Sequence, residues 1–151
     1  MAKKTVFITG TSGSMGGFGL AELMKQRDKF DIVTLVRPSR KNKEAMLDMI
    51  GEPGIKIVWG DLTVYEDVLE CVTGADFVIH PAAFIPPAAD HDPDTAWKIN
   101  VGSMENIVKA VKAQKDPDSV KILGIGSVAE TGDRLYPIHV GRCGDPLKPS
   151  V

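Results

Sequence analysis

Short apolar runs alternate along the chain with stretches in which apolar residues recur every three or four positions. The runs are rich in Val, Ile and Leu and do not alternate with polar residues, a pattern typical of parallel strands that are covered on both faces. They predict strands over residues 5–9, 31–37, 55–59, 77–79 and 120–125, separated by helices over 15–27, 41–50, 65–72 and 93–114. This order of elements predicts an α/β fold, a doubly wound parallel sheet with right-handed crossovers.

The longest predicted helix has a clear start and one apolar face. Asp92 is a capping residue, and Pro93 fits the first helical position, where a missing N–H costs nothing. The apolar positions that follow at steps of four and three are Trp97, Val101, Met104, Val108 and Val111. We interpret this face as core packing and part of it as a candidate subunit interface, because periodicity does not separate the two.

The regular pattern stops near residue 131. Residues 1–130 are long enough for one ordinary domain, whereas 131–151 read as an irregular loop with several Gly and Pro. A compact domain seldom closes with about twenty such residues. We therefore expect a fragment that lacks the later strands and the substrate domain of a longer protein. Such a fragment exposes apolar surface near the fifth strand and the long helix, so we also expect self-association, with a homodimer as its simplest form.

Composition narrows the choice of partners. The chain has 151 residues, of which 43% are hydrophobic and 25% charged, with a formal net charge of −2. No excess of positive charge therefore points to nucleic acid or to an anionic membrane surface, and the sequence contains no evident secretion signal or membrane-spanning stretch. Cys71 and Cys143 have neither metal-ligand nor redox spacing, and free cysteines suit a reducing compartment. We expect a small-molecule substrate, no metal ion and a cytoplasmic location.

Candidate chemistry begins where the first strand ends. Gly10, Gly13 and Gly16 follow that strand at a spacing of three and lead directly into the first helix. Backbone N–H groups and a helix N-terminus then meet at one point, where a diphosphate can bind. Gly10 permits a tight turn, Gly13 lets the ligand approach the backbone, and Gly16 lets the helix press against the strand. A glycine-rich turn alone is weak evidence, but the strand before it and the helix after it favour a dinucleotide site.

The end of the second strand distinguishes the two nicotinamide cofactors. An NAD site usually places Asp or Glu there, about 20 residues beyond the glycines. This chain has no carboxylate at that point, and Asp31 lies too far from the carboxyl end of the strand. We predict that Arg37 binds a 2′-phosphate and that NADP is preferred over NAD. The predicted helpers are Ser39, Arg40 or Lys41. The alternative is a solvated basic loop, which could contact nucleic acid.

Two further candidates follow the third and fourth strands. Asp61 could accept a hydrogen bond from an adenine amino group, or it could cap the helix that begins near Tyr65; the sequence leaves both open. Ala82 and Ala83 are small enough to let cofactor ribose and phosphate pass close to the backbone. His80 precedes them, and a single histidine in such a position is more often structural than catalytic.

Together these pieces resemble the extended short-chain dehydrogenase/reductase family, the group of sugar-nucleotide epimerases and dehydratases. The matching elements occur in family order and are Thr9-Gly10 to Gly16, Arg37, Gly60-Asp61-Leu62, His80-Pro81-Ala82-Ala83, Asn100-Val101-Gly102 and Ser127-Val128-Ala129. An arginine at the end of the second strand is common in the dihydroflavonol-reductase-like branch. The resemblance implies the N-terminal Rossmann portion of an NADP-dependent reductase or epimerase, in which hydride passes between the cofactor and a carbinol or carbonyl carbon.

The resemblance also implies roles for individual residues. The full set of expected cofactor-binding residues is Gly10, Ser12, Gly13, Ser14, Met15, Gly16, Arg37, Arg40, Asp61, Leu62, Ala82, Ala83 and Asn100. By this resemblance Ser14 and Met15 lie at the diphosphate, while Ala82, Ala83 and Asn100 border the nicotinamide half. Ser127 occupies the position of the family's active-site serine or threonine. Judged without the resemblance, Ser127 reads as a turn or cap residue.

One family feature is missing. The family's proton-transfer pair is Tyr and Lys in Y-x-x-x-K, where the lysine charge lowers the tyrosine pKa. Tyr65 precedes the relevant region, and Val140 stands four residues after Tyr136. We therefore expect a chain that binds cofactor without turnover. The alternative is a non-catalytic module that binds or senses a dinucleotide, and a weaker third hypothesis is a nucleic-acid-binding domain that uses residues 37–43.

Overall fold

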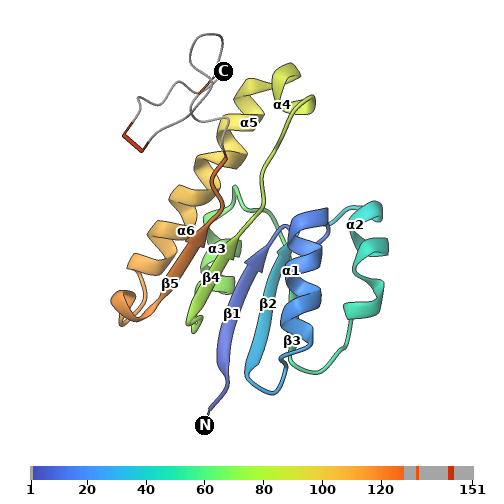
Figure 1. Ribbon diagram of the computed structural model, residues 1–151, viewed down its shortest axis with the longest axis vertical. Helices are drawn as coiled ribbons and strands as arrows, with labels where there is room; N and C mark the ends of the chain where they lie inside the picture. Colours follow the sequence, from blue (N-terminus) through green and yellow to red (C-terminus); the bar gives the residue numbers. More distant parts are fainter. Residues whose placement is uncertain (1, 128–131, 133–142, 145–151) are drawn as a thin grey trace.

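One parallel sheet organises the computed structural model, which describes residues 2–127, 132 and 143–144. The strands are β1 (Lys4–Thr9), β2 (Phe30–Val36), β3 (Ile55–Trp59), β4 (Phe77–His80) and β5 (Lys121–Gly124). Their order is β3-β2-β1-β4-β5, and every neighbouring pair is parallel (Figure 1). The predicted doubly wound sheet is thus confirmed. Because the strand order reverses between β1 and β4, a crevice is expected at their carboxyl ends.

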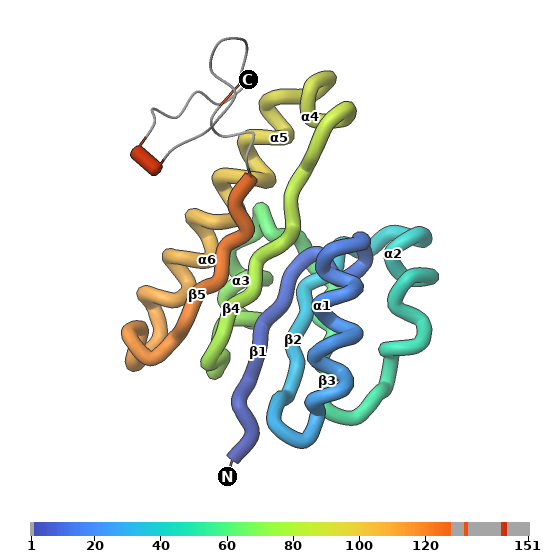
Figure 2. The backbone as a smooth tube through the Cα atoms, viewed as in Figure 1, coloured from blue at the N-terminus to red at the C-terminus, as the bar shows by residue number. Residues whose placement is uncertain are grey.

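Helices cover the sheet in two layers. On one face lie α1 (Ser14–Met24), α2 (Arg40–Ala45) and the 3₁₀ turn η1 (Leu47–Met49); on the other lie α3 (Tyr65–Val72) and α6 (Gly102–Lys112) (Figures 1 and 2). The first layer buries Leu20 and Met46 against Ile8 of β1. The second packs α3 and α6 against Phe7 and Val78. Both faces of the central strands are therefore buried, which explains their unbroken apolar runs.

The long helix predicted over 93–114 is divided in the structure. A short helix α4 (Ala88–His91), which the sequence analysis missed, precedes α5 (Pro93–Asn100), and α6 follows after a break at Val101. The predicted start is correct, because the Asp92 side chain accepts a hydrogen bond from the Thr95 N–H at 3.0 Å and Pro93 begins the helix. Gly102, a poor helix former, stands next to the break. The helix predicted over 41–50 is likewise shortened to α2 followed by η1.

The apolar face predicted for core packing is mostly not the buried one. The residues of α6 that are buried against the sheet and α3 are Ser103, Ile107, Ala110 and Val111. Trp97 of the predicted stripe is 70% exposed, and Val101, Met104 and Val108 are only half-buried. Small side chains at Ser103 and Ala110 allow α6 to approach closely, which the pattern of large apolar residues does not reveal.

The edge strand β5 is exposed along its whole length. Leu123 is 55% exposed and Ile122 40% exposed. On the side of the sheet where α1 lies, no helix among the described residues covers β4 and β5 (Figure 1). The predicted irregular segment 131–151 lies mostly outside the described residues. Within the described part of the chain, no helix combines the length and apolar character that are needed to cross a membrane.

Candidate functional site

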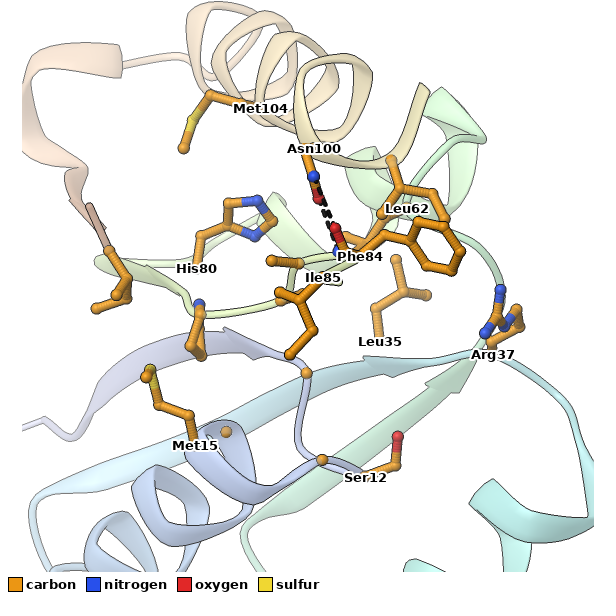
Figure 3. Close-up of a pocket in the computed structure, with 18 of the residues that line it drawn as sticks. Ser12, Met15, Leu35, Arg37, Leu62, His80, Phe84, Ile85, Asn100 and Met104 are labelled. Atoms are coloured by element: carbon orange, nitrogen blue, oxygen red, sulfur yellow. Dashed lines mark hydrogen bonds between the residues drawn. The ribbon is translucent and has the colours of Figure 1, made fainter. Parts of the chain in front are cut away.

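A cavity of about 850 Å³ lies at the carboxyl ends of β1, β2 and β4. Its walls come from the glycine-rich loop before α1, the loops that follow β2, β3 and β4, and the junction of α5 with α6. Arg37 stands at one end of this space, with Met15 and Met104 toward the other (Figure 3). The cavity is therefore centred on the point where the strand order reverses, the usual ligand position in such sheets.

The structure brings almost all of the predicted site residues to this cavity. Those that line it are Gly10, Ser12, Gly13, Ser14, Met15, Gly16, Arg37, Asp61, Leu62, Ala82, Ala83, Asn100 and Ser127. Arg40 does not line it. Its guanidinium forms an ion pair with Glu44 at 2.8 Å on the exposed surface of α2. The spacing of basic residues after β2 could not predict this, because Arg40 is the first residue of a helix and Glu44 lies one turn later.

Residues 10–16, which we call the diphosphate loop, are held against the end of β1. Gly10 has φ of +66°, and the Gly13 N–H donates to the Gly10 carbonyl oxygen at 2.9 Å. A Cβ at Gly16 would overlap the Gly10 carbonyl, so α1 can begin at this depth only with glycine there. The first N–H groups of a helix have no intrahelical acceptor and favour an anion. The loop and the start of α1 thus form a cradle that fits a diphosphate.

A buried polar chain connects β1, β4 and α6 beneath the cavity. His80 Nδ1 lies 2.9 Å from Thr9 Oγ1, and His80 Nε2 lies 3.1 Å from Ser103 Oγ. Thr9 Oγ1 also accepts the Ala82 N–H at 3.2 Å. A neutral imidazole donates from one ring nitrogen and accepts at the other, so it satisfies both hydroxyls. Burial lowers the pKa of His80, because desolvation disfavours the charged ring. His80 therefore has the structural role that the sequence favoured.

The loop after β2 holds Arg37 at the cavity rim. The Asn42 side-chain amide donates to the Arg37 carbonyl oxygen at 2.8 Å, and Ser39 Oγ caps α2 by accepting the Asn42 N–H at 3.1 Å. Ser39 is thus a helix cap in this structure. Asn42 itself lines the cavity, a position that no motif indicated. The loop after β2 thus brings the Arg37 guanidinium and the Asn42 amide to this end of the cavity.

Asp61 lies at the same end, after β3. Its Oδ1 accepts hydrogen bonds from the backbone N–H and the hydroxyl of Thr63, both at 2.9 Å. The residue before α3 is Val64, so Asp61 does not cap that helix and orders its own turn instead. Asp67 of α3 accepts the Asp61 N–H at 2.8 Å, which holds the backbone in place. Of the two sequence interpretations, the helix-cap one is therefore wrong.

A second pair of hydrogen bonds fixes the loop after β4. The Phe84 N–H donates to Asn100 Oδ1 at 2.7 Å, and Asn100 Nδ2 donates to the Phe84 carbonyl oxygen at 2.9 Å (Figure 3). Asn100 thus pairs with a backbone unit as a neighbouring strand would. Phe84, Ile85 and Met104 line this part of the cavity. Sequence reasoning missed these three, since they belong to no motif and only the fold brings them there.

The remaining candidate residues are one serine and two tyrosines. Ser127 lines the cavity beyond the end of β5 and is exposed. Tyr65 lies away from the cavity on α3, with Lys109 Nζ 4.0 Å from the centre of its ring. Tyr136 is outside the described residues. The described part of the chain contains no cluster of three or more His, Cys, Asp or Glu that could hold a metal ion.

Comparisons with known proteins identify a family and related sequences. The sequence pattern of the NAD dependent epimerase/dehydratase family matches residues 6–150. A UDP-glucose 4-epimerase of Rickettsia bellii (strain RML369-C) is 30% identical over 139 residues, which cover 90% of this chain and 39% of the relative. A UDP-glucose 4-epimerase of Rickettsia felis shows the same identity and coverage. The chain thus spans about 39% of the length of these curated relatives.

Solved structures share the fold. The UDP-Glc/GlcNAc 4-epimerase of Campylobacter jejuni has a TM-score of 0.78 at 21% identity, over 97% of this chain and 44% of that one. The Bordetella bronchiseptica enzyme WbmH, solved in complex with NAD+, has a TM-score of 0.75 at 23% identity, over 99% of this chain and 47% of that one. Neither structural likeness alone indicates more than the fold.

The first prediction concerns the depth of α1. Gly16→Ala should lower the free energy of unfolding by more than about 2 kcal/mol, because backbone atoms of Thr9 and Gly10 occupy the space of the new methyl group. Gly102→Ala is the matched control, since nothing lies within 4 Å of its Cβ position. That change should be neutral or stabilise the first turn of α6 by up to about 1 kcal/mol. Urea denaturation measures both, and equal effects would contradict the packing argument.

The second prediction concerns pH. Since the folded-state pKa of His80 is lowered, the unfolded chain takes up the proton first as pH falls below about 6.5. Neutral His80 makes its full contribution to the free energy of unfolding above that pH. The contribution is lost as the pH falls toward the lowered pKa of the folded state, and the free energy of unfolding then changes by at most about 1.4 kcal/mol per pH unit. In urea denaturation from pH 7.5 to 5, His80→Gln should flatten this slope, whereas His91→Gln on the exposed α4 should not. An unchanged slope in His80→Gln would refute the assignment.

Proposed function

Because this chain belongs to the NAD dependent epimerase/dehydratase family, we propose that it is the dinucleotide-binding portion of an enzyme that moves hydride between a nicotinamide cofactor and a carbinol or carbonyl carbon. The observation that carries the proposal is the diphosphate loop, pressed against β1 at Gly16 and open to the cavity. Its amide groups lie where an anionic diphosphate would be held by backbone donors. The chain spans 39% of its curated relatives, so the activity is proposed for a longer protein.

The lining residues suggest how the cofactor would lie. The adenosine half would occupy the end with Arg37, Asp61 and Leu62, and the nicotinamide half would approach Ala82, Ala83 and Asn100. The small side chains of Ala82 and Ala83 leave the backbone accessible, and Asn100 keeps that loop in place through Phe84. When bound, the nicotinamide ring supplies the hydride acceptor or donor.

NADP is the cofactor that the proposal favours. Arg37 lines the cavity at the end of β2, where a carboxylate would repel a 2′-phosphate. The amide of Asn42 fixes the backbone of Arg37 and lies beside it. A guanidinium can bind a phosphate through two parallel hydrogen bonds. This preference is compatible with the reductase-like branch of the family, which we propose on Arg37 alone.

The substrate would meet the cavity near Ser127. By the family resemblance, the Ser127 hydroxyl would orient the substrate oxygen that gains or loses a proton, and its place in the cavity lining supports this role. The curated relatives bear the name UDP-glucose 4-epimerase, which favours a nucleotide sugar as the substrate class. The group that moves the proton would come from residues other than Tyr65, which lies on α3 beneath Lys109 of α6.

Calorimetric titration of the 151-residue chain with both cofactors tests the proposal. The chain should bind both dinucleotides, and Arg37→Asp should weaken NADP binding by about tenfold or more while NAD binding changes little. Arg40→Asp is the matched control, because it makes the same change in charge at a side chain paired with Glu44 outside the cavity. Equal losses for the two cofactors in Arg37→Asp would refute its role. Absence of binding by the folded chain would refute the function itself.

A second candidate function is a module that binds or senses a dinucleotide without catalysis. It is favoured by the sequence, in which neither tyrosine has a lysine four residues later. Such a module would need the cavity and the diphosphate loop but no proton donor. Both candidates therefore predict binding, and they differ only in turnover by the longer protein.

Turnover separates the two. The 151-residue chain should show no steady-state reduction of NADP with carbinol substrates, because no tyrosine–lysine pair is present to move the proton. The absorbance of the reduced nicotinamide at excess substrate measures this. If the downstream reading frame encodes Tyr and Lys four residues apart, the longer protein should turn over and its Tyr→Phe variant should not. Turnover by the short chain would contradict our account of the missing acid/base.

A further inference from the structure

A buried pair of hydroxyl groups joins the diphosphate loop to β2. Thr11 Oγ1 and Thr34 Oγ1 lie 2.7 Å apart, and the two side chains belong to residues that are 5% and 0% exposed. Thr11 follows Gly10 in the loop, whereas Thr34 lies toward the carboxyl end of β2, two residues before its end. No glycine motif and no part of the proposed function uses this contact.

Thr34 is a polar residue on an apolar face of the sheet. In the strand register it stands between Ile8 of β1 and Ile57 of β3, and the same face carries Ile32 and Val36. Among the described residues, Thr11 provides the hydrogen bond recorded for the Thr34 side chain. A valine would suit β2 equally well by strand propensity and would avoid the cost of burying a hydroxyl. The hydrogen bond to Thr11 in the loop is therefore the reason we infer for a hydroxyl at position 34.

We propose that the Thr11–Thr34 contact is a positioning device: it sets the height of the diphosphate loop above β2 and thereby the affinity of the cavity for a dinucleotide. Two hydroxyl oxygens can approach to 2.7 Å because a hydrogen bond joins them. Two methyl groups in the same places would need about 3.5–4.0 Å. The loop would then rise by about 1 Å, since the central strand β2 is fixed on both sides.

A shift of this size matters at the cradle. Hydrogen bonds from backbone N–H groups to phosphate oxygens have a narrow range of lengths, about 2.7–3.2 Å. Gly10 packs closely against the Ala82 backbone, and Gly16 at the start of α1 packs against Gly10, so the loop cannot follow the ligand freely. The Thr11–Thr34 contact would therefore affect how tightly the diphosphate binds and would leave binding of the adenosine part, toward Arg37, unchanged. This inference rests on the proposed dinucleotide site.

The test uses isosteric variants of both threonines. Thr11→Val and Thr34→Val alone each leave one buried hydroxyl without its partner and should lower the urea midpoint; the double variant removes both hydroxyls and should recover most of that loss. Dinucleotide affinity should nevertheless fall by about tenfold or more in the double variant. Adenosine 2′-monophosphate, which lacks the diphosphate, should bind within about threefold of wild type. Thr11→Ser keeps the hydroxyl and should retain dinucleotide affinity.

Thr73→Val is the matched control, because it removes a hydroxyl bonded to the Leu69 carbonyl on α3, away from the cavity. It should change neither affinity. A double variant that binds the dinucleotide as wild type does, or that loses both probes equally, would overturn the proposal. Hydrogen exchange gives a readout that needs no cofactor: the Gly13 and Gly17 amides, bonded to Gly10 and Gly13, should exchange faster in the double variant. Unchanged exchange would overturn the inference, whereas failure of the wild type to bind would refute only the proposed function.

Discussion

The position of α1 against the end of β1 is the constraint from which the site follows. Glycine at position 16 lets the helix begin where any side chain would overlap the Gly10 carbonyl. That depth brings the first residues of α1 to the cavity wall. A Cβ added at Gly10 would lie 3.1 Å from Ala82 Cα, so the turn also packs closely on the loop after β4. The loops after β1 and β4 are consequently in contact. A ligand that bridges them meets backbone donors on one side and small side chains on the other.

Polar contacts between distant segments keep this arrangement rigid. Thr9 bonds to His80 across 71 residues, and Thr11 bonds to Thr34 across 23. Both bonds are buried near the carboxyl edge of the sheet. The two hydrophobic clusters, by contrast, fill the core with apolar side chains. A buried polar pair costs desolvation and contributes little net stability, but it specifies distance and direction more narrowly than apolar packing does. Both pairs lie close to the cavity. We therefore interpret them as contacts that determine the geometry of the site more than the stability of the fold.

The sequence predicted the elements that local chemistry controls and missed those that tertiary contacts control. The strands, the glycine turn and the start of α5 at Asp92 depend on short-range patterns, so the correct fold class follows from them. The break at Val101 and the buried face of α6 depend on how Ser103 and Ala110 approach α3 and the sheet, which periodicity does not encode. The same holds for the site: glycines and Arg37 belong to recognisable motifs, whereas Asn42 and Phe84 reach the cavity only through the fold.

The titratable groups that line the cavity are few. Arg37, Asp61 and His80 are the titratable side chains among its described lining residues. Arg37 and Asp61 follow β2 and β3, and His80 already uses both ring nitrogens and has a lowered pKa. Beyond these three, the described lining residues contribute only backbone, apolar side chains and uncharged polar groups such as those of Asn100 and Ser127. If the proposed hydride transfer is correct, the proton must therefore be moved by a group outside these described residues, whereas binding of a dinucleotide alone requires no such group.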